Sequence, residues 1–271
     1  SVPALLLVIL LVLIPVGVLA ALSFIADGHV SLTHYQRIVA NTSYLWMMQT
    51  TFGLAFAVTG LCALLGLPVA YFLTQLPSGI ARIGLLLVAL PLWVGTLIKT
   101  FAWLTLLQRQ GPVNQSLLSL GLAEQPLSLL YNFGAVVLGS VNIMLPFMIL
   151  PLYNSLSAID KDLVRAAASL GASPTSAFLR VIVPLALPGM LAGGLLIFVV
   201  TLGFYIVPQI LGGGRVITMA VKIQQNVATY FDFGASSSLG VVLLVFVLAF
   251  LLTPALMRTF AGNRRAGRSE R

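Results

Sequence analysis

Six stretches of this sequence are each long and apolar enough to cross a lipid bilayer. A transmembrane helix needs roughly 20 predominantly apolar residues, and only 7% of the 271 residues are charged. The apolar runs are continuous and do not alternate with period two, which excludes a membrane β-barrel. We therefore predict an all-α integral membrane protein. Its six transmembrane helices cover about residues 2–24, 47–73, 83–107, 129–152, 185–207 and 239–256.

The distribution of Lys and Arg predicts how the chain is oriented. If the first helix runs from inside to outside, the inner connections carry nine of these residues and the outer ones four, with Lys99 inside the third span. Five of the nine lie in a basic tail, residues 258–271. Inner loops carry the excess of positive charge in membrane proteins. We therefore expect both termini in the cytoplasm and residues 1–271 to form a single transmembrane domain.

The first apolar stretch does not have the features of a cleaved signal peptide. It begins Ser1-Val2-Pro3 without a basic flank, and it exceeds the usual apolar core of about 7–15 residues. We expect it to be a retained span, and the missing basic flank leaves open whether the native amino terminus is complete.

Motifs for catalysis or cofactor binding are absent from the sequence. There is no G-x-x-x-x-G-K-[ST] phosphate loop, no H-E-x-x-H pair and no G-x-S-x-G elbow. Gly212-Gly213-Gly214-Arg215 is interpreted as an outer turn, and Cys62 alone provides no disulfide or cysteine-based metal site. The net charge of +8 is scattered between apolar runs, so nucleic-acid binding is not expected. We predict a non-catalytic chain that binds no cofactor or metal.

All six acidic residues fall outside the predicted spans. Carriers driven by protons or sodium commonly use carboxylates or histidines inside the membrane. A chain without them would need another subunit to supply energy for uphill transport. At this point three functions stay open: an energised permease, a stand-alone carrier or channel, and a membrane scaffold without a transport role.

The longest inner connection, residues 154–183, has the signals of two short helices. Asp160 is positioned to cap the first helix, and Gly171 follows its apolar stripe as a stop signal. Ser173-Pro174 then restarts a helix, with serine as the cap and proline in the first turn. We predict a helix-turn-helix on the cytoplasmic face that leads into the fifth span.

This connection resembles the EAA motif of ABC-importer permeases. The family pattern is Glu-Ala-Ala, three residues, Gly, nine residues, Ile, one residue and Leu-Pro. Here Ala166, Ala167, Gly171 and Pro184 match in register, and Val181 stands in the Ile position. Arg165 departs from the pattern, because the family usually has Glu there. In that family the loop docks onto a cytoplasmic ATPase, so the resemblance implies that Arg165, Ala166, Ala167, Gly171, Val181 and Pro184 couple this chain to an ATPase.

The likeness extends over most of residues 30–255 and indicates the spermidine/putrescine importer group, specifically the first of its two permease subunits. It is carried by Leu145–Tyr153, Pro91-Leu92-Trp93, Lys99–Trp103, Gly111–Asn114 and Phe204–Gly213. The resemblance implies a bacterial inner-membrane permease that moves a small solute, such as a polyamine, by alternating access. The implied partners are an ATPase dimer carrying ATP and Mg, a second homologous permease and an extracytoplasmic solute-binding protein.

Lys99, Phe204, Tyr205 and Gln209 are the candidate pathway residues, all toward the outer ends of their spans. A charge inside a span usually faces protein or water, but Lys99 can equally snorkel to the headgroups. Tyr205 offers an aromatic face to an ammonium group, although aromatic residues are also common at membrane interfaces. Gly189-x-x-x-Gly193 is a close-packing helix motif.

Overall fold

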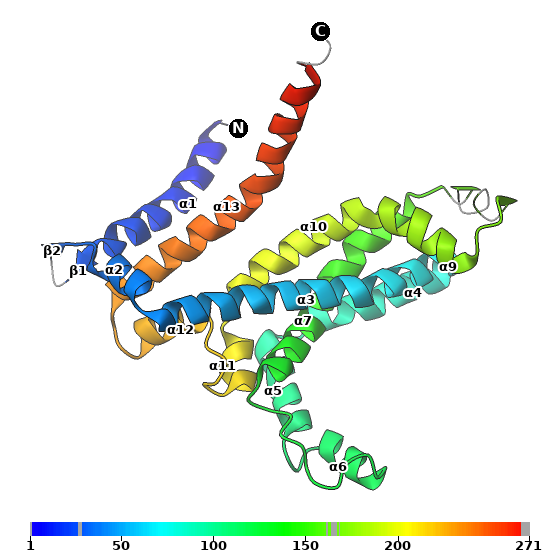
Figure 1. The fold of residues 1–271 in the computed structure, drawn as a ribbon, viewed down its shortest axis with the longest axis horizontal. Helices are drawn as coiled ribbons and strands as arrows, with labels where there is room; N and C mark the ends of the chain where they lie inside the picture. The colour runs from blue at the N-terminus through cyan, green and yellow to red at the C-terminus, as the bar shows by residue number, and fades with distance from the viewer. Residues whose placement is uncertain (1, 27–28, 161, 164–166, 168, 267–271) are drawn as a thin grey trace. The chain divides into compact units, whose positions relative to one another are not determined.

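Helices make up nearly all of the computed structural model, which describes residues 2–26, 29–160, 162–163, 167 and 169–266 (Figure 1). The first part contains α1 (Val2–Ser23), the strands β1 (Ile25–Ala26) and β2 (His29–Val30), α2 (Thr33–Ala40) and α3 (Thr42–Gln75). The middle part contains α4 (Ser78–Ala89), the 3₁₀ helix η1 (Leu90–Trp93), α5 (Thr96–Leu107), α6 (Pro112–Ser119) and α7 (Phe133–Ser157). The last part contains α9 (Pro174–Ala177), the π-helix η2 (Phe178–Ile182), α10 (Val183–Leu202), α11 (Ile206–Gly212), α12 (Met219–Ala228) and α13 (Phe233–Ala266).

The helices confirm the predicted all-α membrane fold. Among the described residues, five helices are long and apolar enough to cross a membrane, and a sixth span results if one bent pair counts as a single crossing. The predicted fifth span, residues 185–207, ends earlier than expected, because α10 stops at Leu202 and α11 begins separately at Ile206. The two-residue strands pair Ile25 with Val30 and Ala26 with His29, a small antiparallel hairpin that the sequence did not predict.

The predicted third span, residues 83–107, is broken in the middle. Ser78–Trp93 and Thr96–Ser119 form the bent pair, with an angle of 93° between them. Pro91 lacks a backbone N–H and favours the end of a helix, and Gly95 takes an extended conformation at the break, with ψ of 141°. Lys99 stabilises the bend, because its Nζ donates a hydrogen bond to the Pro91 carbonyl oxygen at 3.1 Å.

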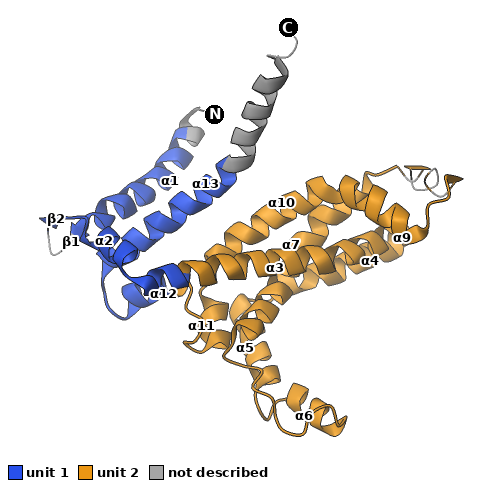
Figure 2. Cartoon of the chain, viewed as in Figure 1, with its two compact units in different colours: residues 1–47, 222–271 blue, residues 48–221 orange. Residues whose placement is uncertain are grey.

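The chain divides into two compact units, residues 1–47 with 222–271 and residues 48–221 (Figure 2). In the first unit α1 packs along α13. The Tyr35 hydroxyl on α2 donates to Ser23 Oγ at the end of α1, at 2.8 Å. Gly234, near the start of α13, lies against the His34 side chain, because a Cβ added to this glycine would lie only 2.6 Å from His34 Nε2. These contacts hold α2 and the hairpin against the start of α13.

The second unit has its core between α7 and α10, which pack more extensively than any other pair of the described helices. Gly189 and Gly193 make this possible. A Cβ at Gly189 would lie 2.7 Å from the Pro151 carbonyl oxygen, and one at Gly193 would lie 3.1 Å from the Phe147 carbonyl oxygen. The close-packing role predicted for Gly189-x-x-x-Gly193 is therefore confirmed, and the packing fixes α10 firmly along α7.

Candidate coupling site at the α7–α10 connection

The first part of the connection shows the capping geometry that its residues predict. The Asp160 carboxylate accepts a hydrogen bond from the Asp162 backbone N–H at 2.9 Å. Gly171 has φ of +84°, and the Ala172 N–H donates to the Ala167 carbonyl oxygen at 3.0 Å. A left-handed glycine with this bond is the Schellman ending of a helix. Of the predicted coupling residues here, Ala167 and Gly171 are placed, whereas Arg165 and Ala166 lie outside the described residues.

Leu170, immediately before this glycine, is exposed over 89% of its surface. A large apolar side chain presented to water at the end of a helix stabilises nothing within its own chain. Gly171 is exposed as well, and a Cβ added to it would meet no atom within 4 Å. The tip of the connection therefore presents an open apolar surface next to a backbone without a side chain.

The second part of the connection runs without interruption into the fifth span. Ser173 Oγ accepts from the Ser176 N–H at 3.3 Å, and Pro174 follows in the first turn, as predicted. Helical residues then continue from Pro174 to Leu202. Ser173 therefore lies at one end of a single continuous helical segment, Pro174–Leu202, which we call the rod.

A π-helical turn, Phe178–Ile182, lies within this rod. The Val183 N–H donates to the Phe178 carbonyl oxygen five residues earlier. Pro184 explains the wide turn, because its ring would clash with the Arg180 carbonyl in a regular α-helix and it has no N–H to donate. The predicted coupling residues Val181 and Pro184 thus lie at this turn, Val181 half-buried and Pro184 exposed.

The base of the rod is anchored on α3. The Phe178 ring meets the Tyr71 ring edge-on, with centroids 5.2 Å apart and an angle of 63° between the planes. Ile182, one turn later, is 3% exposed. An aromatic pair and a buried branched side chain therefore hold this part of the connection against α3.

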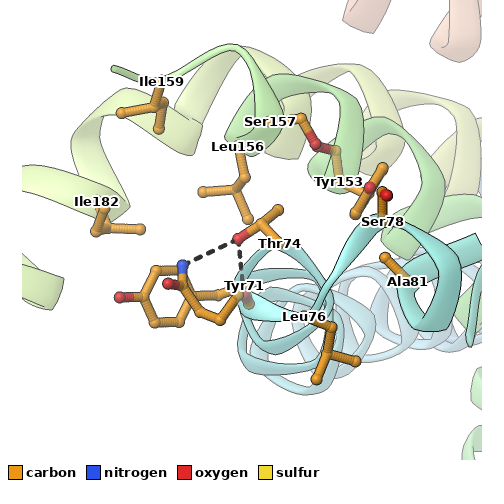
Figure 3. Close-up of a pocket in the computed structure, with 11 residues that line it drawn as sticks. Tyr71, Thr74, Leu76, Ser78, Ala81, Tyr153, Leu156, Ser157, Ile159 and Ile182 are labelled. Atoms are coloured by element: carbon orange, nitrogen blue, oxygen red, sulfur yellow. Dashed lines mark hydrogen bonds between the residues drawn. The ribbon is translucent and has the colours of Figure 1, made fainter. Parts of the chain in front are cut away.

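A cavity of about 610 Å³ lies beside this anchor, between the α3–α4 turn, the end of α7 and the π-turn (Figure 3). Neutral side chains line it: Tyr71, Thr74, Gln75, Leu76, Ser78, Ala81, Tyr153, Leu156, Ser157, Ile159 and Ile182. Its hydroxyls are partly engaged with backbone, since Thr74 Oγ1 donates to the Tyr71 carbonyl at 2.7 Å and Ser157 Oγ to the Tyr153 carbonyl at 2.6 Å.

Our sequence predictions did not include these cavity residues. The sequence signal that could have indicated them is a pair of polar side chains, three or four residues apart, near the end of an apolar span. Tyr71 with Thr74 and Tyr153 with Ser157 are such pairs. Such pairs are common at membrane interfaces, so the pattern alone does not select them.

The candidate pathway residues lie away from the connection, on α5 and around α11, two helices that pack together. Phe204 is half-buried, and its carbonyl oxygen accepts from Thr218 Oγ1 at 3.3 Å. Tyr205 and Gln209 are exposed, whereas Lys99 is half-buried and bonded to Pro91. Two of the four predicted residues therefore present their side chains freely, and Lys99 is engaged in holding the broken span.

The turn after α11 has the conformation predicted for Gly212-Gly213-Gly214-Arg215. Gly213 and Gly214 have φ of +53° and +77°. Beside them the Tyr131 N–H donates to the Leu211 carbonyl oxygen at 2.9 Å, and a Cβ at Gly213 would clash with the Tyr131 ring. Glycine is thus required here by close packing as well as by φ.

Among the described residues, the apolar spans and the connection that leads into α10 define a multi-pass helical membrane protein. Residues 1–261 match the family described as binding-protein-dependent transport system inner membrane component. The chain belongs to this family and is the permease subunit of an ABC importer.

Curated relatives agree with this assignment. The chain is 34% identical to the spermidine/putrescine transport system permease protein PotB of Escherichia coli (strain K12), over 80% of this chain and 81% of the relative. It is 32% identical to the PotB protein of Haemophilus influenzae (strain ATCC 51907 / DSM 11121 / KW20 / Rd), over 90% and 88% of the two chains.

A solved structure has the same fold. A bacterial ABC transporter involved in the import of the acidic polysaccharide alginate superposes with a TM-score of 0.72 at 17% identity, over 94% of this chain and 92% of that one. Together the comparisons confirm the predicted multi-pass inner-membrane permease, which is not itself an enzyme and which works with a binding protein. The carrier, channel and scaffold alternatives are set aside by the family assignment.

Proposed function

We propose that this permease moves a polyamine, such as spermidine or putrescine, from the extracytoplasmic binding protein into the cytoplasm by alternating access. The observation that carries the proposal is the 34% identity over 80% of the chain to a spermidine/putrescine permease. The likeness to the alginate importer, at 17% identity, supports the fold and says nothing about the solute.

The proposed assembly contains a second homologous permease and a dimer of cytoplasmic ATPase subunits, which hold ATP and Mg. The α7–α10 connection is the docking element for the ATPase. Its exposed Leu170 and the open backbone at Gly171 favour contact with an apolar groove on another protein. Arg165 and Ala166 belong to the same proposed contact from their sequence positions, together with Ala167, Val181 and Pro184.

Coupling then follows from the mechanics of the connection. When the ATPase dimer closes, it displaces the helix that ends at Gly171, and the rod beginning at Pro174 receives that movement. Ile182 lines the open cavity beside the α3–α4 turn. The cavity gives the base of α10 room to shift toward that turn without a clash, because protein interiors are otherwise close-packed.

For the solute, Tyr205 and Gln209 are the better pathway candidates. An exposed tyrosine ring attracts an ammonium group through its π-face, and the Gln209 amide oxygen can accept a hydrogen bond from it. Lys99 is not proposed as a ligand, since its positive charge repels a polyamine and its Nζ already donates to Pro91.

The test is uptake of radiolabelled putrescine and spermidine by cells that lack their own polyamine import. The cells carry this permease and the subunits that co-purify with it. We expect uptake that depends on ATP and on the binding protein. If the complex assembles and hydrolyses ATP but takes up neither polyamine, the proposal that the solute is a polyamine is refuted, while the permease assignment stands.

A further inference from the structure

The segment that follows α5 stands apart from the helical core of its unit. Helix α6 packs against α5, and Figure 1 shows it clear of α3, α4, α7 and α10. A segment in this position finds few partners within its own chain, so what its exposed side chains contact is decided by the surroundings of the protein.

Asn114 fixes the shape of this segment. Its side chain is fully buried, and Nδ2 donates to the carbonyl oxygens of Gln108 and Leu127, each at 3.0 Å. Its Oδ1 accepts from the Leu127 N–H at 2.9 Å. One amide therefore ties both ends of residues 108–127 together, and the surface that this segment presents is a property of the fold.

Four exposed leucines belong to this fixed segment, and we refer to them together as the leucine face. Leu118, Leu120, Leu122 and Leu127 are exposed by 37%, 70%, 71% and 47%. Exposing this much apolar surface to water is unfavourable, and apolar patches of this kind mark contact with a membrane or another protein.

The polar side chains of α6 favour lipid over protein as the contact. Ser116 Oγ donates to the Pro112 carbonyl at 2.9 Å, Ser119 Oγ to the Ser116 carbonyl at 3.0 Å, and Gln115 Nε2 to the Gln110 carbonyl at 3.0 Å. Donors satisfied within the segment cost less to bring near hydrocarbon. A surface for recognising a protein would instead keep a rim of polar groups available to its partner.

The leucine face also follows, along the chain, a helix that belongs to an apolar span. Helix α5 is part of the broken apolar span, and its Leu97, Ile98 and Phe101 are 49%, 66% and 48% exposed. Arg109 and Glu124 are the only charged residues of the sequence between Gln108 and Asn132. They flank Leu118, Leu120 and Leu122 in sequence and would meet the headgroup layer when these leucines enter the acyl chains.

We propose that the leucine face inserts into the outer leaflet of the membrane and anchors the outer half of the broken span at the interface. The outer side follows from the distribution of Lys and Arg in the sequence. The proposal does not depend on which solute the permease carries.

Spin-label accessibility tests this proposal in the complete transporter, purified and placed in phospholipid nanodiscs. Leu120→Cys and Leu122→Cys are labelled in a Cys62→Ala background, after uptake has been shown to be retained. Oxygen reports exposure to lipid, and a water-soluble nickel chelate reports exposure to water. Ile98→Cys is the matched lipid control, and Asn41→Cys, exposed in the polar connection between α2 and α3, is the water control.

We expect the labels at 120 and 122 to collide with oxygen more often than with nickel, as at 98, both with and without binding protein. Nickel access equal to that at 41, falling when binding protein is added, would overturn the proposal in favour of a protein-docking surface. Low collision rates with both reagents would also overturn it and would indicate cover by the second permease.

Discussion

At the scale of single residues, Gly171 has a backbone that other residues rarely adopt, with φ of +84°. A side chain at this position costs about 1–2 kcal/mol of strain. This cost is enough to reduce the population of the docking-competent conformation by about tenfold. We predict that Gly171→Val lowers uptake by at least that factor and removes stimulation of the ATPase, while membrane insertion is unchanged. Uptake and ATPase assays on the same preparation measure both effects.

Gly214 provides the matched control for this prediction. It has φ of +77°, and a Cβ added to it meets no atom within 4 Å, as at Gly171. Gly214→Val carries the same strain but lies outside the α7–α10 connection. If both variants lose uptake equally, the effect is one of general strain and the coupling role of Gly171 is refuted.

Lys99 allows a second test at this scale, because its ammonium group holds the Pro91 carbonyl across the break in the third span. We predict that Lys99→Met lowers the maximal uptake rate several-fold and leaves KM for the solute unchanged, whereas Lys99→Arg retains most of the rate. A charge-assisted hydrogen bond contributes about 1.5–3 kcal/mol. A lower KM for polyamine in Lys99→Met would show instead that the charge repels the solute within its pathway.

At the scale of elements, the α7–α10 pair should be sensitive to small increases in side-chain size. A Cβ at Gly189 would lie 2.6 Å from Ser155 Cβ, whereas one at Gly60 on α3 meets nothing within 4 Å. We predict that Gly189→Ala destabilises the protein by about 1–3 kcal/mol through overpacking. Gly60→Ala should be neutral or stabilising, because alanine is the better helix former by about 1 kcal/mol. Thermal unfolding in detergent compares the two, and equal midpoints would contradict the packing account.

Local signals explain which elements the sequence predicted correctly. The Asp160 cap, the Gly171 stop and the Ser173-Pro174 restart each depend on a few neighbouring residues, and all three have the expected geometry. The break at Gly95 and the π-turn at Phe178–Ile182 were not predicted, although Pro91 and Pro184 lie beside them. Proline permits a break, but its angle depends on packing between distant helices, as with α5 against α11.

The candidate site was likewise predictable only where its residues are close together in the sequence. Gly171, Val181 and Pro184 could be selected as coupling candidates because the motif lies within one connection of the sequence. The cavity was missed because Tyr71, Tyr153 and Ile182 come from separate elements that only folding brings together. The bond from Lys99 to Pro91 was likewise not expected, since the sequence left a pathway role and snorkelling open.

At the scale of the whole molecule, we propose that the α7–α10 connection docks an ATPase, and that this ATPase powers transport. The most direct measurement places a photo-cross-linking amino acid at position 170, where the native leucine is 89% exposed. Irradiated membranes of the native assembly are then analysed by mass spectrometry, with the same probe at position 120 as control. We expect an ATPase adduct at 170 that changes with bound nucleotide, and none at 120. Failure to form an ATPase adduct at 170, with the ATPase present and the probe incorporated, would contradict the proposal.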